Sequence, residues 1–458
     1  MRTLALALVA VIIPAAAAAE TPAGLAAQAD EALKSDQTAW DFVEGITTEV
    51  GPRQAGTEAE ARGRAWAQDW LSRNGFARVM LEPYKMDTWL RGAERAEVVT
   101  PFPQKLVIAA LGDSGSTGEG GITAPVVGFS SYAKLEAAPA GSLKGKIAFI
   151  DHSMRVTQDG SGYAFAGPVR WTGPALAASK GAVAAVIRSV GTDDHRTPHT
   201  GGTTFAEGVK PIPAGALSNP DADNLERMLA RAGARGAELT MKLVLTPRFV
   251  GQTESGNVVS EITGRDPSLP PVLLACHLDS WDLGTGAIDD GAGCGIIAAA
   301  ARHVAAAGQP LRTIRLLFAG AEETGVWGGN AYAAAHAKEP VAVAMESDFG
   351  ADRVWRLDTN FTATNPELYK RLANAVARFG VSTSAVDASG GADIEIARQQ
   401  GGAVIELQQD GTRYFDLHHT ADDTLDKIDP AQLRQNVAVW TQVVGILANE
   451  PGPIKPAE

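Results

Sequence analysis

The residues best suited to chemistry are five histidine and carboxylate side chains in the C-terminal half of the sequence. Each lies at or just beyond the end of a strand-like segment, or in a loop. In chain order they are His277, Asp289, Glu323, Asp348 and His419. Zinc is bound in proteins by this mixture of imidazole and carboxylate. Five ligands suit two metal ions better than one, because a shared carboxylate can bridge two cations about 3.5–4 Å apart. The sequence therefore predicts two zinc ions per chain at one site.

The segments that carry these residues predict how they are positioned. Apolar runs at 272–276 and 313–319 are separated by a helical pattern, which is typical of parallel strands covered on both faces. In open α/β sheets, ligand sites form at the carboxyl ends of such strands. Alone, a histidine at a strand end often only forms hydrogen bonds, and the adjacent Glu322 and Glu323 are typical of a helix N-terminus. Their joint placement at strand ends is what favours a metal site.

The remaining segments predict an α/β fold, a mostly parallel central sheet with helices on both faces. Apolar residues recur with helical spacing in some segments, whereas others are short continuous apolar runs. The predicted helices are 36–51, 58–74, 291–307, 327–338, 366–379, 392–400 and 430–449. The predicted strands are 79–84, 106–110, 272–276, 313–319, 341–345 and 403–407.

The length of the chain predicts two domains, because 458 residues exceed what one hydrophobic core usually fills. A loop over 112–121 is dense in glycine and serine, and we interpret it as a boundary. Short strands and helical patterns then alternate over 122–246. This alternation predicts a smaller α/β domain inserted between two catalytic parts, 20–121 and 247–458.

Two further pairs of reactive side chains have more ordinary interpretations. His195 and His199 are four residues apart, but Pro198 between them argues against a shared helix face. We expect a surface loop there, with contact to substrate as the alternative. Cys276 and Cys294 are the only cysteines, one at the end of a strand and the other in the next helix. An exported protein could pair them, but we expect two buried free thiols.

Composition and the N-terminus indicate an exported protein. The formal net charge of −13 argues against nucleic acid or an anionic membrane as the main partner. Arg2, the apolar run 4–13 and the small residues 17–19 together predict a signal peptide over 1–19, cleaved before Glu20. The run is too short for a membrane anchor. We therefore expect a soluble periplasmic or secreted protein.

Five motifs resemble, in the same order, those of the co-catalytic zinc exopeptidase family. They are His277-Leu278-Asp279-Ser280-Trp281-Asp282, Ala287-Ile288-Asp289-Asp290-Gly291, Ala321-Glu322-Glu323, Glu346-Ser347-Asp348 and His418-His419. Within that family the motifs are most similar to the carboxypeptidase Q group, the plasma glutamate carboxypeptidases. Residues 122–246 resemble the protease-associated domain that many members carry as an insert. The resemblance covers nearly all of the mature chain and implies the zinc-exopeptidase fold.

The resemblance also implies metal ligands at five positions. His277 and Asp348 would hold one zinc ion, Glu323 and His419 the other, and Asp289 would bridge the two. In this family the peptide bond that matches Asp289-Asp290 is typically cis.

Further residues receive supporting roles from the same resemblance. Glu322 would be the general base, because its neighbour Glu323 is drawn to a cation while Glu322 stays within reach of the zinc-bound water. Asp279 would orient the His277 imidazole, and Asp423 would brace the loop that carries His419.

The sequence departs from the family at one position. Some relatives have a tyrosine before the last metal-binding histidine, where its hydroxyl stabilises the tetrahedral intermediate, whereas this chain has His418. An imidazole donor could do the same, or His418 could pack locally. Asp393 lies where relatives often have an acidic residue near the metals, and it is a candidate site residue.

Three functions compete on this basis. The first is a di-zinc exopeptidase that cuts short peptides with free termini, as a carboxypeptidase, dipeptidase or aminopeptidase. The second is a glutaminyl cyclase with one zinc ion, and the third is a binding module with an inactive peptidase fold, as in transferrin receptor-like proteins. The intact ligand set and Glu322 argue against the third, and the inserted domain argues against the second. A homodimer is expected from the family only.

Overall fold

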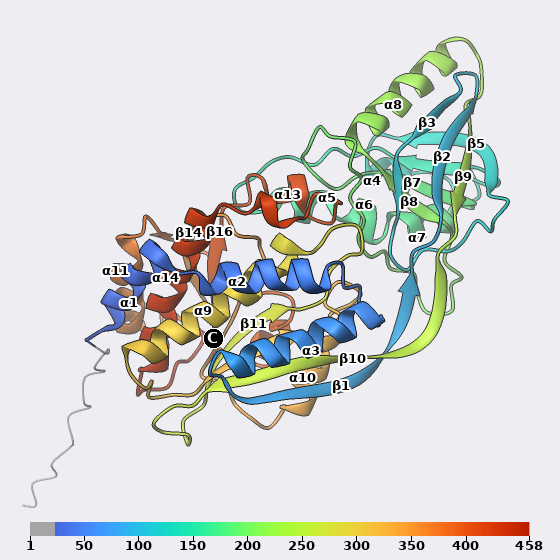
Figure 1. The fold of residues 1–458 in the computed structure, drawn as a ribbon. Coiled ribbons are helices and arrows are strands. Elements are labelled where there is room, and N and C mark those ends of the chain that lie inside the picture. Colours follow the sequence, from blue (N-terminus) through green and yellow to red (C-terminus); the bar gives the residue numbers. More distant parts are fainter. Residues whose placement is uncertain (1–22, 458) are drawn as a thin grey trace, which may run out of the picture.

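The computed structural model describes residues 23–457, so the expected signal peptide at 1–19 lies outside the described residues. Two eight-stranded sheets organise the chain into two lobes (Figure 1). The large lobe comprises residues 23–90 and 248–457, and the small lobe comprises residues 91–247. Within residues 23–457, no helix combines the length and the apolar character that crossing a bilayer requires.

The large-lobe sheet has the strand order β1-β10-β12-β11-β13-β16-β14-β15. Its strands are β1 (Ala77–Leu90), β10 (Arg248–Ile262), β11 (Val272–His277), β12 (Ile314–Ala319), β13 (Val343–Glu346), β14 (Val354–Thr359), β15 (Ser382–Thr383) and β16 (Val404–Gln409). The four central strands, β12, β11, β13 and β16, are parallel, and antiparallel pairs flank them. The expected α/β fold is confirmed, with a parallel centre rather than a parallel sheet throughout.

Helices cover both faces of this sheet. The helices of the large lobe are α1 (Leu25–Ser35), α2 (Thr38–Gly45), α3 (Glu58–Arg73), α9 (Ala292–Ala307), α10 (Trp327–Ala335), α11 (Pro366–Ala377), α12 (Glu395–Gln399), α13 (Tyr414–Leu417) and α14 (Pro430–Ala448). Successive residues of β11 point to opposite faces, so Leu274 joins the core under α9 and α14 while Leu273 joins a second core that includes Tyr332 of α10. Burial on both faces explains why β11 is a continuous apolar run.

The small-lobe sheet has the order β3-β2-β9-β5-β6-β7-β8-β4. Its strands are β2 (Glu94–Thr100), β3 (Gln104–Leu106), β4 (Ile108–Ala110), β5 (Ile122–Phe129), β6 (Ile147–Ile150), β7 (Ala184–Arg188), β8 (Ala214–Leu217) and β9 (Thr240–Leu245). Its helices are α4 (Tyr132–Glu136), α5 (Ser161–Ala166), α6 (Pro168–Trp171), α7 (Gly173–Ser179) and α8 (Asn219–Ala234). This sheet therefore begins at Glu94, before the boundary that the loop 112–121 predicts.

The strand expected over 106–110 shows why the boundary differs. The segment is divided at Val107, whose backbone N–H donates to Asp221 at 2.7 Å. β3 then pairs with β2, and β4 pairs with β8, so both halves belong to the small lobe. The pairing partners of so short an apolar run are distant in the sequence, and its composition does not reveal them.

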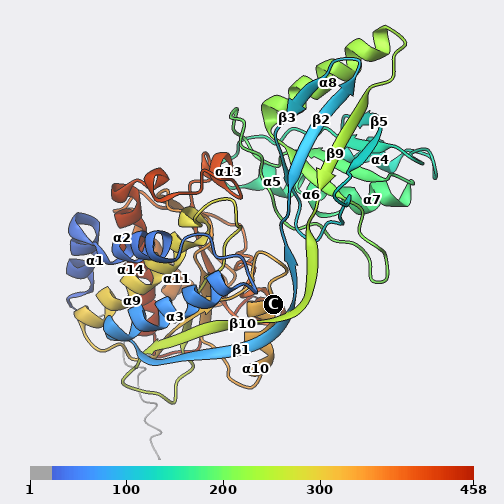
Figure 2. The same cartoon turned by 45° about the vertical axis from the view of Figure 1, so that its right-hand side comes forward.

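Two long strands carry the chain between the lobes. β1 and β10 pair antiparallel over nearly their full length, from Ala77 opposite Glu261 to Leu90 opposite Arg248. Figures 1 and 2 show this ribbon along the edge of the large lobe, curving up to the small lobe. The chain therefore enters and leaves the small lobe at neighbouring points.

Candidate metal centre

The parallel strands bring the predicted ligands to one sheet edge. His277 is the last residue of β11 and pairs with Ala319, the last residue of β12, while Ala275 pairs with Glu346 at the end of β13. The loop after β12, which carries Glu323, therefore starts level with His277, and the loop after β13, which carries Asp348, starts two residues earlier. This alignment is the reason that residues more than 70 positions apart in sequence meet.

Asp289 lies between the two histidines. Its Oδ1 is 3.0 Å from Nε2 of His277, and its Oδ2 is 3.3 Å from Nε2 of His419. Asp348 approaches the same nitrogen of His277 at 3.4 Å, and Glu323 approaches that of His419 at 2.9 Å. The five residues form two groups that share one carboxylate, the arrangement that a bridging ligand between two cations requires.

The chemistry of these donors fits metal ions. Buried oxygens of Asp289, Glu323 and Asp348 have no hydrogen-bond partner, and such atoms are costly unless something pairs with them. Burial alone would lower the pKa of His277, but Asp348 and hydrogen bonds with Asp279 and Asp289 outweigh it and raise that pKa well above its ordinary value. Several buried carboxylates around one imidazole are stabilised by positive charge, which divalent cations would supply.

Asp279 fastens the loop that carries the adjacent glutamates. Its two carboxylate oxygens accept the backbone N–H groups of Glu322 at 3.0 Å and Glu323 at 3.4 Å. Its backbone carbonyl accepts from Nδ1 of His277 at 3.1 Å, so Nε2 faces Asp289. Asp279 therefore aligns three functional residues, although the sequence predicts a role for it toward His277 alone.

The Asp289 loop is held by Asp423 and by an arginine that the sequence does not single out. Asp423 accepts the N–H groups of Ala287 at 2.8 Å and Ile288 at 2.7 Å, so it braces the loop of Asp289 rather than that of His419. Arg53 is fully buried and donates to the carbonyls of Leu278, Thr285 and Gly286 at 2.5, 2.6 and 2.9 Å. The Asp289-Asp290 peptide is cis, as the resemblance implies.

Glu322 differs from Glu323 in what its side chain contacts. Its half-buried side chain lines the cavity beside the centre, whereas the neighbouring Glu323 contacts His419. Burial raises the pKa of Glu322 well above its ordinary value; His277 partly opposes this rise, and nearby carboxylates that include Asp348 add to it. Glu322 and Glu323 therefore face different surroundings despite their adjacency.

His418 stacks on His419, with ring centres 3.5 Å apart. Its Nε2 lies 3.6 Å from Asp289, and its side chain lines the cavity. Burial and the adjacent His419 hold the pKa of His418 well below its ordinary value. Its ring is therefore neutral and still carries one N–H donor.

The expectation that His199 lies in a surface loop is wrong. His199 is 1% exposed, its Nδ1 donates to the His418 carbonyl at 2.7 Å, and its Nε2 lies 2.5 Å from an oxygen of Asp193. His195 is exposed, as expected. Tertiary packing of the small lobe against the His418 loop explains the difference, since no local pattern encodes that contact.

Asp393 does not line the cavity. Its carboxylate accepts the N–H of Gly329 at 3.2 Å, and its own N–H donates to Glu346 at 3.0 Å. Burial raises the pKa of Asp393 well above its ordinary value, and Glu346 reinforces the effect. The structure therefore gives Asp393 contacts behind the centre rather than at it.

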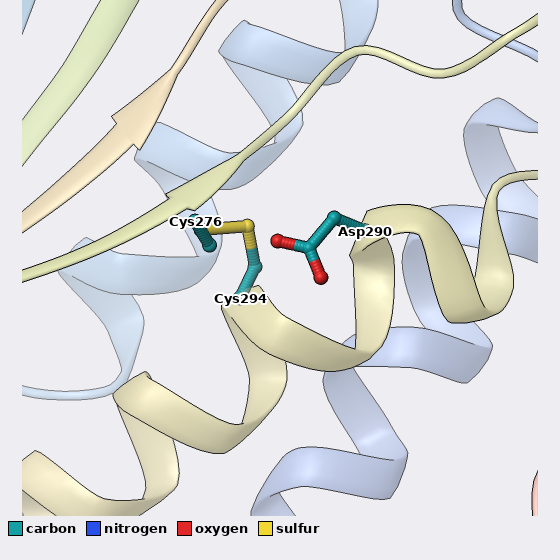
Figure 3. A group of neighbouring side chains, drawn as sticks. All are labelled: Cys276, Asp290 and Cys294. Atoms are coloured by element: carbon teal, nitrogen blue, oxygen red, sulfur yellow. A yellow bond between two sulfur atoms is a disulfide. The ribbon is translucent and has the colours of Figure 1, made fainter. Parts of the chain in front are cut away.

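The expectation of two free thiols is also wrong. Cys276 and Cys294 form a disulfide that joins the end of β11 to α9, next to Asp290 (Figure 3). Asp290 accepts the N–H of His277 at 3.1 Å and that of Gly293 at 3.0 Å, which draws the helix toward the strand. The loop between the cysteines folds back on itself, a proximity that sequence spacing does not reveal.

A cavity of about 430 Å³ lies over the centre, between the two lobes. Its lining from the large lobe includes Asp289, Glu322, Glu323, Asp348, Tyr414, His418 and His419. Its lining from the small lobe includes Asp113, Tyr163, Arg170, Trp171, Thr203 and Thr204. Trp281 and Asp282 of the first motif join the lobes: Trp281 packs into the small-lobe core, and Asp282 pairs with Arg91 at 2.8 Å.

Comparisons with known proteins agree with this geometry. The pattern of peptidase family M28 matches residues 257–444. Carboxypeptidase Q of Bos taurus is 32% identical over 419 residues, 91% of this chain and 86% of that protein. Carboxypeptidase Q of Mus musculus is 33% identical over 403 residues, 87% of this chain and 83% of that protein.

Solved structures extend the likeness to the fold. The crystal structure of a peptidase M28 precursor from Shewanella amazonensis SB2B superposes with a TM-score of 0.90, at 42% identity over 95% of this chain and 98% of that one. A zinc aminopeptidase from Bacillus subtilis shares the fold, with a TM-score of 0.62 at 20% identity over 89% of this chain and 94% of that one. The chain therefore belongs to peptidase family M28 and is a metallopeptidase.

Proposed function

We propose that this metallopeptidase binds two zinc ions and removes single residues from short peptides with free termini. The observation that carries the proposal is Asp289, whose two oxygens face two histidines, each with a second carboxylate. His277 and Asp348 would hold one ion, and Glu323 and His419 the other. Bound zinc acts as a Lewis acid toward the scissile carbonyl and makes water a better nucleophile near neutral pH.

The residues around the metals would divide the remaining work. Glu322 would take a proton from the attacking water and return it to the leaving amine, because it lines the cavity without contacting either histidine. His418, with its one remaining ring proton, would stabilise the oxyanion that develops at the carbonyl. Asp279 and Asp423 would act indirectly, through the backbone groups that they hold.

The shape of the site supports an exopeptidase for short substrates. The small lobe roofs the metal centre and leaves a cavity of about 430 Å³, which suits a dipeptide better than the interior of a long chain. The similarity to carboxypeptidase Q favours dipeptides and C-terminal cleavage, and an aminopeptidase is the alternative within the family. The small lobe would be a protease-associated domain, and the N-terminal segment would direct export to the periplasm or beyond.

The competing functions predict other sites. A glutaminyl cyclase would need only one zinc ion, so one of the two ligand pairs, such as Glu323 and His419, would bind no metal. An inactive binding module would not need Glu322 in the cavity wall. Both ligand pairs and Glu322 are present, which favours hydrolysis.

Metal analysis and a small substrate panel test the proposal. The purified chain, dialysed after zinc loading, should hold about two zinc ions and cut unblocked dipeptides. A stoichiometry that never exceeds one, with full activity, would favour the cyclase. Efficient cutting of an internal bond in a doubly blocked peptide would refute an exopeptidase.

A further inference from the structure

One arginine of the small lobe lies in the wall of the cavity. Arg170 belongs to α6, and its side chain is 6% exposed. Its guanidinium carbon lies 5.3 Å from the ring centre of Tyr163 and 6.0 Å from that of Trp171, so two aromatic rings hold it in place. The acidic residues of the lining are Asp113, Asp289, Glu322, Glu323 and Asp348. Among the lining residues that the structure describes, Arg170 is the one permanent cation.

Arg170 has no carboxylate partner. Across residues 23–457, no carboxylate oxygen lies within 4.0 Å of its nitrogens, and its Nε has no hydrogen-bond partner. Its Nη1 lies 3.5 Å from the carbonyl oxygen of Thr200 and 3.2 Å from Nδ1 of His419. Other buried arginines have more acceptors: Arg64 pairs with Glu60 at 2.7 Å, and Arg53 donates to three carbonyls. Neutral acceptors alone, the Tyr163 hydroxyl included, leave the charge of this buried guanidinium uncompensated, which is costly unless a ligand supplies a negative charge.

His419 does not supply the missing acceptor when the centre is loaded. Its Nε2 faces Asp289 and Glu323, so a metal there would take the lone pair of Nε2 and leave the ring proton on Nδ1. Nδ1 would then donate to the Thr200 carbonyl, 3.3 Å away. Nδ1 of His419 and Nη1 of Arg170 would then both carry protons, so no hydrogen bond could form between them. The guanidinium is therefore available to an anion that enters the cavity.

We propose that Arg170 binds the α-carboxylate of the residue that follows the scissile bond. This inference rests on the proposed peptidase function of the same site. A single imidazole ring separates the Nη1 of Arg170 from the Nε2 of His419 that faces the metals. An anion bound by Arg170 would therefore lie close to the metals, which suits a single residue after the scissile bond better than a longer tail. The site would thus release the C-terminal residue, and a free C-terminus would be required.

A carboxylate in the side chain of the same residue has the same chemistry, so the test must separate the two. Alanyl-alanine, alanyl-alanine amide and alanyl-aspartic acid α-amide serve as substrates for the zinc-loaded chain. Arg170→Gln removes the charge, and Arg170→Lys keeps it without the fork of donors. Arg235→Gln is the control, since Arg235 lies over Phe102 in the same lobe, is exposed, and does not line the cavity.

The wild type should cut alanyl-alanine well and both amides poorly. Arg170→Gln should lose roughly 10- to 150-fold in kcat/KM on alanyl-alanine, the range of a lost hydrogen bond to a charged group, with little change on the amides. Arg170→Lys should recover part of that loss, and zinc content should stay at the wild-type value in both variants.

Three results would overturn the assignment. Equal wild-type rates on acid and amide would show that no α-carboxylate is recognised. Equal losses on all substrates in Arg170→Gln, with loss of zinc, would mean that Arg170 only supports His419. Strong cutting of the aspartic acid α-amide that Arg170→Gln abolishes would assign the side-chain carboxylate instead. A zinc-loaded wild type that cuts none of the three would refute the proposed function rather than the role of Arg170.

Discussion

Replacing Glu322 and Glu323 separately by glutamine is the sharpest test of how the centre works. Glutamine keeps the shape of each side chain and removes its charge and its basicity. Glu323 lies 2.9 Å from Nε2 of His419, whereas Glu322 lines the cavity and forms no ion pair with either histidine among the described residues. Two adjacent carboxylates should therefore yield opposite phenotypes.

The expected magnitudes follow from these surroundings. Glu322→Gln should keep about two zinc ions and lose only proton transfer, which contributes typically about 10²–10⁴-fold. That factor corresponds to a rise of about 2.7–5.4 kcal/mol in the activation free energy. Glu323→Gln should instead bind one zinc ion weakly, because an amide leaves His419 and Asp289 as the remaining ligands of that ion.

The assay combines zinc analysis, dipeptide turnover and thermal unfolding of each variant. Wild-type unfolding of Glu322→Gln shows that the fold is intact, so its lost turnover can be assigned to chemistry. Loss of zinc from Glu322→Gln, with two ions retained by Glu323→Gln, would reverse the assigned roles. More than a tenth of wild-type kcat in Glu322→Gln would show that Glu322 is not the general base.

Three further perturbations test the scaffold. Arg53→Met leaves three carbonyls without their donor, so it should lower the free energy of unfolding by about 3 kcal/mol or more and weaken zinc binding. An unchanged midpoint of urea unfolding would contradict this. Burial, with a contribution from Asp87, raises the pKa of Asp113 from 3.8 to about 6, so the native state holds the proton more tightly than the unfolded chain. Wild-type stability should then fall, by at most about 3 kcal/mol, as pH rises from 4 to 6, and pH-dependent unfolding of Asp113→Asn should lack that fall. Replacing Cys276 and Cys294 by alanine should lower stability by about 3 kcal/mol, because their disulfide closes a short loop of 18 positions; chemical unfolding measures this, and unchanged stability would refute it.

The sequence was most informative about candidate metal ligands that directly follow predicted strands. Continuous apolar runs predict parallel strands, and parallel strands bring their carboxyl ends together, so the meeting of His277, Glu323 and Asp348 at one edge could be expected. The helices over 291–307 and 430–449 were also predictable, because their apolar spacing is long and regular, and they match α9 and α14.

Contacts between distant segments could not be read in this way. No motif in the sequence distinguishes Arg53 or Arg170 from the other arginines. Tertiary packing brings carbonyl groups to Arg53 and aromatic rings to Arg170. His199 packs against the His418 loop through a contact across 219 positions. Burial and pairing of such residues depend on the folded geometry, which local periodicity does not encode.

The paired strands β1 and β10 have a consequence for how substrate preference can evolve. Because the chain leaves the large lobe at Leu90 and returns opposite it at Arg248, the segment between them can be exchanged without altering the strand order that aligns the metal ligands. The metal-ligand edge and the small-lobe part of the cavity wall thus come from separable stretches of the gene. Recombination at those two points could give an inherited catalyst a new specificity in a single event, whereas point mutations would have to rebuild the cavity one residue at a time.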